Sequence, residues 1–535
     1  MMILSSNESI HGIISKLNRS VLRERRANNI VNHISYDDSD HGNQSSAPGE
    51  FPFSSGIHPG MYKTKSWNIR QYSGYGTAAD ANKNFQKLIK AGNRGISIAF
   101  DLPTQMGLST CDELAKFEVG KVGVSINTLD DMRQLLKGID LEEVEVSMTI
   151  NSTAGIVLLM YHIIAEENEL DSVKLRGTLQ NDILKEFITR STHIFPLDQS
   201  LRFTNNVLEY CEKELPNWSP ISISGYHFAE AGASSAQEVA FAIANGIHYL
   251  ENANSFGLSV HKIARKVSFF FAARTNILEE IAKFRAARSV WAKIVKDRFH
   301  FEDPKALQMR IHAQTAGSEL LPFGIENNLS RVTIQAMAAI LGGVQSLHTN
   351  SYDEALNLPS EKGSKLAINI QQILKNETDL TLASDPFRGS FVIENLTNQI
   401  ELEIFRIIGE IKDHGGLVKS VSLGFQRELI EKNSYADAVS LSKNKKKVVG
   451  LNSGAIIEEI PEIDLSFLNT PSIVSPTKIN ELKINDADID QKLFSELVFS
   501  AENNTNIMYP IKNLLKAGAN MSDICEILHK CWGKA

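Results

Sequence analysis

The sequence predicts an α/β protein built on a TIM (β/α)8 barrel, with an N-terminal arm and a C-terminal helical extension. Its 535 residues suffice for one barrel of about 250 residues with extensions at both ends. From Trp67 onward, short apolar segments alternate with helical patterns, as is typical of a parallel sheet made of βα units. The expected strands are residues 95–101, 144–151, 175–181, 221–227, 267–272, 308–315, 346–350 and 382–385.

The same patterns divide the chain into three parts. Residues 1–65 mix polar turn formers with few apolar residues and end in a stretch rich in proline and glycine, which predicts an arm or linker. Residues 66–405 contain the expected barrel. Residues 406–535 lose the strand pattern, which predicts a linker and a helical C-terminal region. We interpret the basic run at 443–447 as a solvated loop, with contact to an acidic partner as the alternative.

Composition and charge exclude several classes of protein. With 42% hydrophobic and 22% charged residues, the chain has the composition of an ordinary globular protein. The net charge of -8 argues against a partner bound through its phosphate backbone, so we expect no nucleic acid. The N-terminus shows neither a secretory signal nor a membrane-spanning segment, so we expect a cytoplasmic protein that does not bind a membrane. Four scattered cysteines indicate reduced thiols rather than disulfides or a zinc site.

Small hydroxylated residues recur at alternate positions of several expected strands. A barrel interior is normally filled by bulky branched side chains, so small polar ones facing inward would leave a channel along the axis. A long, thin ligand could pass through it. The alternative is that these positions face the helices, where apolar residues are usual. The residues are Ser97, Ser147, Thr149, Thr178, Ser222 and Ser224.

Other polar residues fall at the carboxyl ends of expected strands, the edge where TIM-barrel enzymes keep their catalytic groups. Because these ends meet at one rim, we expect a catalytic site there. The sequence has no phosphate-binding loop, GxGxxG, HExxH or GxSxG motif, which disfavours P-loop NTPases, Rossmann dehydrogenases, zinc proteases and serine hydrolases. The rim residues are Gln180 and Asn181, Tyr226 and His227, His312 and Gln314, and His348 and Asn350.

Six segments carry a resemblance to a known family. They are WNIRQYSG (67–74), AFDLPT (99–104), GTLQNDILKEF (177–187), ISISGYH (221–227), FRAAR (284–288) and LGGVQSLHTNSYDEA (341–355). These segments closely resemble the adenosylcobalamin-dependent acyl-CoA mutases, above all the large catalytic subunit of methylmalonyl-CoA mutases. The resemblance implies a TIM barrel whose axis holds the pantetheine arm of coenzyme A and whose C-terminal rim meets adenosylcobalamin. It also implies a radical rearrangement in which the thioester carbonyl migrates to the neighbouring carbon.

The resemblance implies catalytic roles for four residues. Tyr72 matches a tyrosine that packs beside the substrate and helps to displace the adenosyl group. Arg190 matches an arginine that pairs with the free carboxylate of the substrate, a role suited to a planar fork of donors. His227 matches a histidine that hydrogen-bonds the migrating carbonyl, and Gln180 matches a glutamine near the same thioester. The structural alternatives are that Arg190 is a surface arginine and Tyr72 only a packing ring.

The resemblance also implies two binding sets and no metal-ligating set. The set for coenzyme A and substrate is Met61, Lys65, Arg70, Thr178, Lys266, Ser268, His312, Gln314, Gln345 and Ser346. The set for adenosylcobalamin is Phe100, Val122, Arg190, Gly317 and Glu354.

The sequence departs from the methylmalonyl pattern at several positions. Lys65 and Lys266 replace arginines that touch coenzyme A, which keeps the charge but loses bidentate geometry. Gln105 and Met106 replace a His-Arg pair, and residues 108–111 replace a Tyr-Asp-Ser-Asp run. None of the 14 histidines lies in the DxHxxG motif that supplies the cobalt ligand in full-length mutases. We therefore expect a separate small cobalamin-binding subunit, in a homodimer or heterotetramer.

Three functional hypotheses follow. The first is the catalytic subunit of an enzyme that interconverts methylmalonyl-CoA and succinyl-CoA. The second is a large subunit acting on isobutyryl-CoA or 2-hydroxyisobutyryl-CoA, although such relatives usually replace the tyrosine and arginine. The third is a silent scaffold subunit, against which the presence of Tyr72, Gln180, Arg190 and His227 argues.

Overall fold

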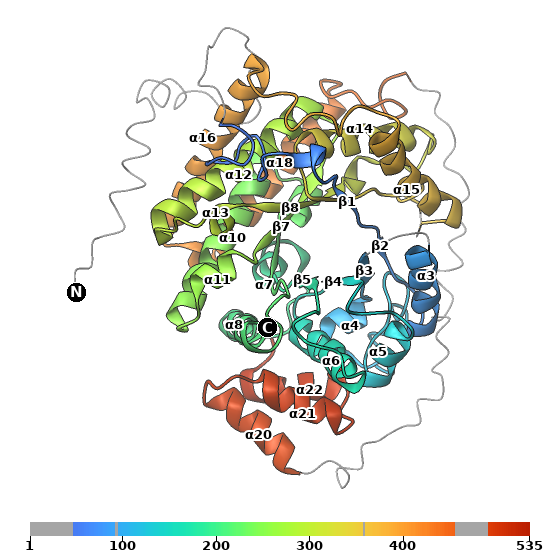
Figure 1. The fold of residues 1–535 in the computed structure, drawn as a ribbon, viewed down its shortest axis with the longest axis vertical. Coiled ribbons are helices and arrows are strands. Elements are labelled where there is room, and N and C mark those ends of the chain that lie inside the picture. Colours follow the sequence, from blue (N-terminus) through green and yellow to red (C-terminus); the bar gives the residue numbers. More distant parts are fainter. Residues whose placement is uncertain (1–45, 91–94, 357–358, 455–490) are drawn as a thin grey trace, which may run out of the picture.

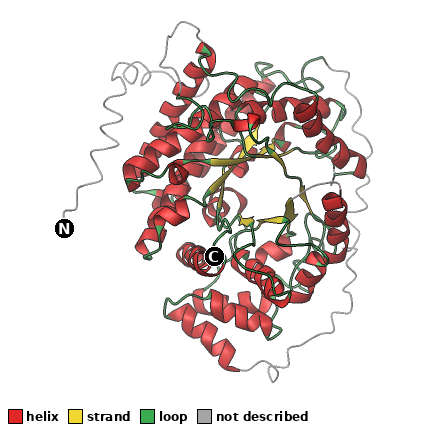
Figure 2. Ribbon diagram, viewed as in Figure 1, coloured by secondary structure: helices red, strands yellow, loops and turns green. Residues whose placement is uncertain are grey.

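The computed structural model describes residues 46–90, 95–356, 359–454 and 491–535. Figure 1 shows short strands at the centre and helices around them, and Figure 2 shows how small the share of strand is. Residues 1–45 of the expected arm and the expected linker near residues 461–476 lie outside the described residues. The strands are β1 (Asn68–Ile69), β2 (Tyr72–Ser73), β3 (Gly95–Ala99), β4 (Glu145–Thr149), β5 (Gly177–Leu179), β6 (Ser222–Ser224), β7 (Ser268–Ala273), β8 (Arg310–Thr315) and β9 (Ser346–His348).

All strand pairs are parallel and form two sheets, in the orders β1-β9-β8-β7-β6 and β2-β3-β4-β5. One chain segment joins the sheets, because β1 and β2 are separated only by Arg70 and Gln71. At the other junction the Ser222 amide donates to the Gln180 carbonyl over 2.9 Å, and the Leu179 amide donates to the Ser219 carbonyl over 2.9 Å. The strands therefore follow one another around a TIM-barrel-like fold, as the sequence predicted.

One expected strand is wrong, and a different segment takes its place. Residues 382–385 are irregular and contain no strand, and Leu382 is 73% exposed. The segment of β1 and β2 completes the set instead, although Ile69 is its only aliphatic residue. Expected strand 221–227 is also too long, because Tyr226 and His227 lie in a helix.

Helices connect and surround the strands, as expected for βα units. Capping boxes start three of them: Thr128 with Asp131, Ser234 with Gln237, and Asn520 with Asp523. The connecting elements are η2 (Met61–Lys63), α3 (Ala78–Lys90), α4 (Leu102–Met106), α5 (Leu129–Leu136), α6 (Ala154–Glu167), α7 (Ile183–Lys185), the π-helical turn η3 (Glu186–Arg190), α8 (Leu197–Glu214), α9 (Tyr226–Glu230), α10 (Ser235–Ser255), α11 (Val260–Ala264), α12 (Ile277–Phe299), α13 (Pro304–Leu307), η4 (Gly317–Glu319) and α14 (Asn327–Leu341).

The later helices continue the outer layer. In the described residues, no helix combines the length and apolar character needed to cross a bilayer. The later helices are α15 (Glu361–Asn376), α16 (Phe391–Asp413), α17 (Leu417–Ser422), α18 (Phe425–Ser442), α20 (Gln491–Glu502), α21 (Met508–Lys516) and α22 (Met521–Trp532).

Both ends of the described chain pack onto the barrel layer. In the arm, Tyr62 donates to the Val344 carbonyl over 2.5 Å, and Arg288 donates to the carbonyls of Phe53 and Ser54. At the other end, α20, α21 and α22 lie beside α6 and α8 (Figure 1). Apolar residues of these helices share one buried cluster with β3, β4 and α6, so the C-terminal region contributes to the core.

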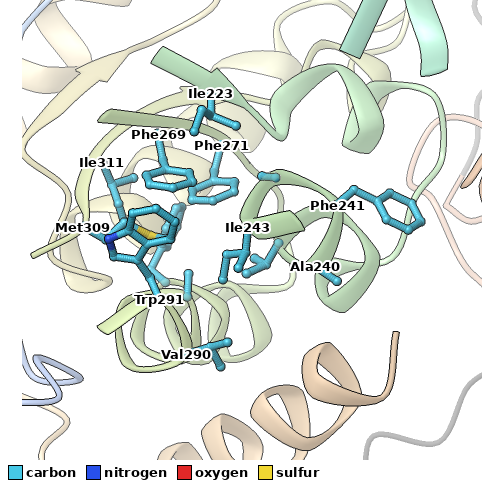
Figure 3. Close-up of a cluster of buried hydrophobic side chains, with 14 of the residues drawn as sticks. Ile223, Ala240, Phe241, Ile243, Phe269, Phe271, Val290, Trp291, Met309 and Ile311 are labelled. Carbon is cyan, nitrogen blue, oxygen red and sulfur yellow. The ribbon is translucent and has the colours of Figure 1, made fainter. Parts of the chain in front are cut away.

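A second core cluster lies between the sheet and helices α10 and α12 (Figure 3). Because side chains alternate along a strand, Phe269 and Phe271 of β7 point into this cluster, where Phe269 packs edge-on against Trp291 at 4.8 Å between ring centres. The intervening residue of the same strand, Phe270, faces the barrel axis. The alternation thus separates an apolar outer face from an inner face available for a site.

A glycine in α10 allows this close packing. A Cβ on Gly246 would lie 2.9 Å from Trp291 and 3.0 Å from Ile223. We expect Gly246→Ala to lower the free energy of unfolding by about 1–3 kcal/mol, because overpacking outweighs the gain in helix propensity. Gly409 of α16 has no neighbour within 4 Å of its Cβ position, so Gly409→Ala should instead stabilise by about 0.5–1 kcal/mol. Denaturant unfolding checks both, and equal shifts would contradict the packing argument.

Candidate active site

A cavity of about 440 Å³ runs through the barrel along its strands; we call it the axial channel. Strand β4 lines it with Glu145, Ser147 and Thr149, and β8 lines it with alternate residues from Arg310 to Gln314. Each set covers positions i, i+2 and i+4, so the channel follows both strands for about 13 Å. It therefore extends from the amino ends of the strands to their carboxyl ends.

Small hydroxylated side chains form much of the wall. Among those expected to do so, Ser97, Ser147, Thr149, Thr178 and Ser222 line the channel. Ser224 does not line the channel itself: its side chain is fully buried, and its Oγ lies 2.8 Å from Nδ1 of His227, which does line it. The interpretation that these residues face inward is confirmed for the rest.

The four predicted catalytic residues all line the axial channel at the carboxyl ends of the strands. Tyr72 begins β2, and its amide donates to Nδ1 of His348 over 2.9 Å. Gln180 follows β5, and His227 is the second residue of α9 after β6. Arg190 ends η3; such single π-turns are frequent at functional sites. Residues from four separate segments therefore meet at one mouth of the channel. We call it the catalytic mouth because the four predicted catalytic residues line it.

The ionisable groups at this mouth have defined protonation states. Burial and the nearby cations of Lys185 and Arg190 hold the pKa of His227 well below its ordinary value, so the ring is neutral. Burial raises the pKa of Tyr72 to about 12, which keeps its phenol protonated. Arg190 forms no ion pair with any carboxylate of the described residues. The mouth thus offers neutral donors and the guanidinium of Arg190, whose charge lowers the pKa of Glu186 without an ion pair between the two side chains.

The opposite mouth carries guanidinium groups. Arg70, Arg176 and Arg310 line it, and Arg70 pairs with Glu145 at 3.0 Å. Only Arg70 was among the predicted binding residues. The alternation along β4 and β8 could have revealed Glu145 and Arg310, since each lies two positions before an inward-facing residue. Other wall residues that sequence reasoning missed as site residues are Asn68, Met148, Asn217, Ser219, Phe270 and Ile311.

Comparison with known proteins decides the family. Residues 24–534 match the family model described as methylmalonyl-CoA mutase. The chain belongs to the methylmalonyl-CoA mutase family. It is 40% identical to the 2-hydroxyisobutanoyl-CoA mutase large subunit of Aquincola tertiaricarbonis, over 91% of this chain and 87% of that protein.

Two methylmalonyl-CoA mutases are similar at lower coverage. The identity to the Escherichia coli enzyme is 38%, over 90% of this chain and 68% of that protein. The identity to the human mitochondrial enzyme is 37%, over 91% of this chain and 65% of that protein. The chain thus spans about two thirds of the length of these methylmalonyl-CoA mutases.

The structure brings most of the binding set expected for this mutase family to the axial channel. Three members lie elsewhere: Met61 is buried within the arm itself, Lys65 is exposed, and Lys266 is half-buried before β7. The members that line the channel are Arg70, Thr178, Ser268, His312, Gln314, Gln345 and Ser346.

The expected cofactor set of the mutase family is more dispersed. Phe100 is fully buried in the core, so only its backbone is available; its carbonyl accepts a 2.7 Å hydrogen bond from Gln105. Val122 is 66% exposed. A Cβ on Gly317 would lie 3.9 Å from the Tyr226 hydroxyl, and Glu354 interacts electrostatically with Tyr72. Gly317 and Glu354 thus lie near the catalytic mouth.

Glu354 lies at this rim with its side chain partly exposed, and its carboxyl group has a raised pKa. Burial, with the negative charges of Asp353 and Glu230, raises its pKa from 4.5 to about 7. Between these values the folded state binds more protons than the unfolded state, so the contribution of this group to stability is present at low pH and lost as the pH rises through 7. We expect the free energy of unfolding of the native chain to fall relative to that of Glu354→Gln from about pH 5 to about pH 8. Denaturant unfolding at several pH values measures this, and parallel curves would contradict it.

Proposed function

We propose that this chain is the catalytic subunit of an adenosylcobalamin-dependent acyl-CoA mutase that interconverts methylmalonyl-CoA and succinyl-CoA. The observation that carries the proposal is Arg190, a cation at the channel wall with no ion-pair partner among the described residues. Both substrates carry a free carboxylate, and a guanidinium can bind a carboxylate through two parallel hydrogen bonds. The neutral donors His227 and, nearby, Gln180 suit the thioester carbonyl.

The shape of the axial channel supports an acyl-CoA substrate. The pantetheine arm of coenzyme A is long, thin and amide-rich, and the channel is narrow and lined by hydroxyl groups such as those of Ser147 and Thr178. At the far mouth, Arg176 and Arg310 suit the phosphates of coenzyme A. The acyl group then lies at the catalytic mouth, beside Tyr72.

The rim beside the catalytic mouth suits the flat face of a large cofactor. After β3, the chain exposes Leu102, Leu114, Phe117 and Val122, with Leu114 80% exposed. We propose that Val122, Arg190, Gly317, Glu354 and the backbone at Phe100 hold adenosylcobalamin here. When bound, this cofactor supplies the carbon-centred radical that abstracts a hydrogen atom from the substrate.

The residues of this chain then control the reaction around that chemistry. Arg190 holds the substrate carboxylate, and His227 donates a hydrogen bond to the carbonyl that migrates. The ring of Tyr72 covers the acyl group and excludes water from it. With adenosylcobalamin bound at this rim, the reactive centre would be enclosed by the channel wall, which would suppress stray reactions with solvent.

Two alternative functions can be compared with the polar residues at the catalytic mouth. The similarity to a 2-hydroxyisobutanoyl-CoA mutase large subunit favours an uncharged branched acyl group. Such a substrate would leave Arg190 without a counter-ion in the channel, which is costly for a partly buried charge. A silent scaffold subunit would have no need for four polar groups gathered at one mouth.

We propose that the cobalt ligand comes from a separate small cobalamin-binding subunit, in an assembly with a homodimer or heterotetramer of large subunits. The relative described as a large subunit supports this arrangement. The four cysteines are all free, which suits the reducing cytoplasm that we propose as its location.

The deciding experiment assays the purified chain with methylmalonyl-CoA and adenosylcobalamin, with and without a separately purified subunit that carries a DxHxxG motif. We expect formation of succinyl-CoA only in the presence of that subunit. Turnover by the chain alone would overturn the proposed division between subunits. Turnover of isobutyryl-CoA or 2-hydroxyisobutyryl-CoA, with none of methylmalonyl-CoA, would overturn the proposed substrate.

A further inference from the structure

Asn151 follows β4 and lies directly behind the wall of the axial channel. It is 7% exposed and does not line the channel. Its Nδ2 lies 2.6 Å from Oε1 of Glu186 and 3.0 Å from Oε1 of Gln180. Its Oδ1 accepts a 3.0 Å hydrogen bond from the amide of Asp182. Asn151 thus connects three residues around the catalytic mouth.

These contacts determine which way the amide of Asn151 points. A backbone amide can only donate, so the atom of Asn151 facing the amide of Asp182 is the oxygen. Burial raises the pKa of Glu186, but Lys185 and Arg190 outweigh it and lower the pKa overall, so this side chain is an ionised acceptor. The atom of Asn151 facing Glu186 is therefore the NH2 group.

The orientation of Asn151 in turn determines that of Gln180. Because the NH2 group of Asn151 also faces Gln180, the atom of Gln180 that receives it must be the oxygen. The NH2 group of Gln180 is then directed away from Asn151, toward the channel that this side chain lines. Gln180 presents a donor, and not an acceptor, to a ligand.

A second donor at the same mouth is set in a similar way. The Oγ of Ser224 lies 2.8 Å from Nδ1 of His227 and has no other hydrogen-bond partner among the described residues. A fully buried hydroxyl donates where it can, so its proton points at Nδ1. The neutral ring of His227 then carries its own proton on Nε2. Two donors, one directly after β5 and one in α9 after β6, therefore serve one mouth.

We propose that Asn151 is a positioning residue that holds Gln180 with its NH2 group toward the thioester carbonyl oxygen of the substrate. This inference rests on the proposed acyl-CoA substrate. Asn151 does not touch the ligand, so its effect passes through Gln180. Without Asn151, the amide of Gln180 is free to rotate and loses its preference for the donor orientation.

The test compares two ligands that differ only at the carbonyl. One is methylmalonyl-CoA, and the other is a thioether analogue in which a CH2 group replaces the carbonyl. Their dissociation constants are measured by calorimetry on the full chain without cobalamin. We expect Asn151→Ala to lower the preference for the thioester by about threefold to tenfold, the value of one neutral hydrogen bond. Gln180→Ala should lower it equally, and the double variant should lose no more than either single one.

The control is Asn205→Ala. Asn205 is a buried asparagine of α8 whose amide atoms have no hydrogen-bond partner among the described residues, and it does not line the channel. This variant should keep the native preference. An unchanged preference in Asn151→Ala, or additive losses in the double variant, would overturn the positioning role.

If Asn151→Ala does not fold, Gln180→Glu tests the same orientation of the Gln180 amide. This variant retains an oxygen for Asn151 but replaces the NH2 group with an oxygen, so it should lose the preference for the thioester. Retention of the preference would show that the oxygen of Gln180 faces the ligand. If the native chain binds neither ligand, the proposed acyl-CoA function is wrong, and the positioning role of Asn151 is wrong with it. If the native chain binds both ligands but the variants do not behave as expected, only the positioning role is wrong.

Discussion

Arg190→Gln should slow turnover of methylmalonyl-CoA far more than turnover of an uncharged acyl-CoA. The substitution removes a cation of the channel wall that the proposed carboxylate can pair with, while glutamine keeps a similar length and some hydrogen bonding. Loss of a charge-assisted pair that leaves the other charge buried costs on the order of 2–5 kcal/mol. This corresponds to a decrease in kcat/KM of about thirtyfold to several thousandfold. Steady-state assays with both substrates, in the presence of adenosylcobalamin and the small subunit, measure the difference.

Arg176→Gln is the matched control because Arg176 lines the same channel at its other mouth. There, the proposed ligand is the part of coenzyme A that all acyl-CoA substrates share. This variant should therefore raise the KM for both substrates by the same factor. If Arg190→Gln also affected both substrates equally, Arg190 would not be the carboxylate-binding residue.

The inner face of the barrel was the part of the site that the sequence predicted best. Alternation fixes which residues of a strand point inward, and hydroxylated residues at those positions stand out against the branched residues usual in a barrel. Ser147 and Thr149 of β4 show this, since both line the channel, whereas Val146, the neighbour of Ser147, is buried in the apolar core. The four predicted catalytic positions came from the resemblance, and the structure brings them to one mouth.

The strand errors have one physical cause. Strands were recognised by apolar runs, but β1 and β2 are only two residues each and face a polar channel, so their segment is mostly polar. The opposite error concerns Leu382: its apolar side chain indicated a buried strand, but the structure exposes it in an irregular segment. Parallel pairing of β1 with β9 and of β2 with β3 joins segments far apart in the sequence, which a local pattern does not reveal.

The residues behind the channel wall were the least predictable part. Asn151 and Ser224 act through hydrogen bonds to Gln180 and His227, and such bonds depend on side-chain directions in three dimensions. In the sequence, Asn151 is one polar residue in a run of polar and small residues after a strand. Only the contacts with Glu186 and the amide of Asp182 distinguish it.

His227→Ala should slow the rearrangement by about two to four orders of magnitude, the range for removal of one positioned donor or acid. The ring is neutral because burial, Lys185 and Arg190 hold its pKa well below its ordinary value. We therefore expect the ring to act as a hydrogen-bond donor and not as an acid that titrates near neutral pH. The loss should appear in kcat, with little change in the affinity for methylmalonyl-CoA, and should be the same across neutral and alkaline pH.

A matched control separates this role from a structural one. His248 lies in α10, where burial lowers its pKa as well, but it does not line the channel. His248→Ala should leave turnover close to that of the native chain, because it changes a buried histidine without removing a donor at the catalytic mouth. If a folded His227→Ala variant that still binds acyl-CoA kept near-native turnover, the ring of His227 would serve only to pack against Phe270 and Tyr226, whose ring centres lie 6.2 and 5.5 Å from its own. A pH-dependent loss would instead indicate that His227 gains a proton during the reaction, which the charges of Lys185 and Arg190 oppose.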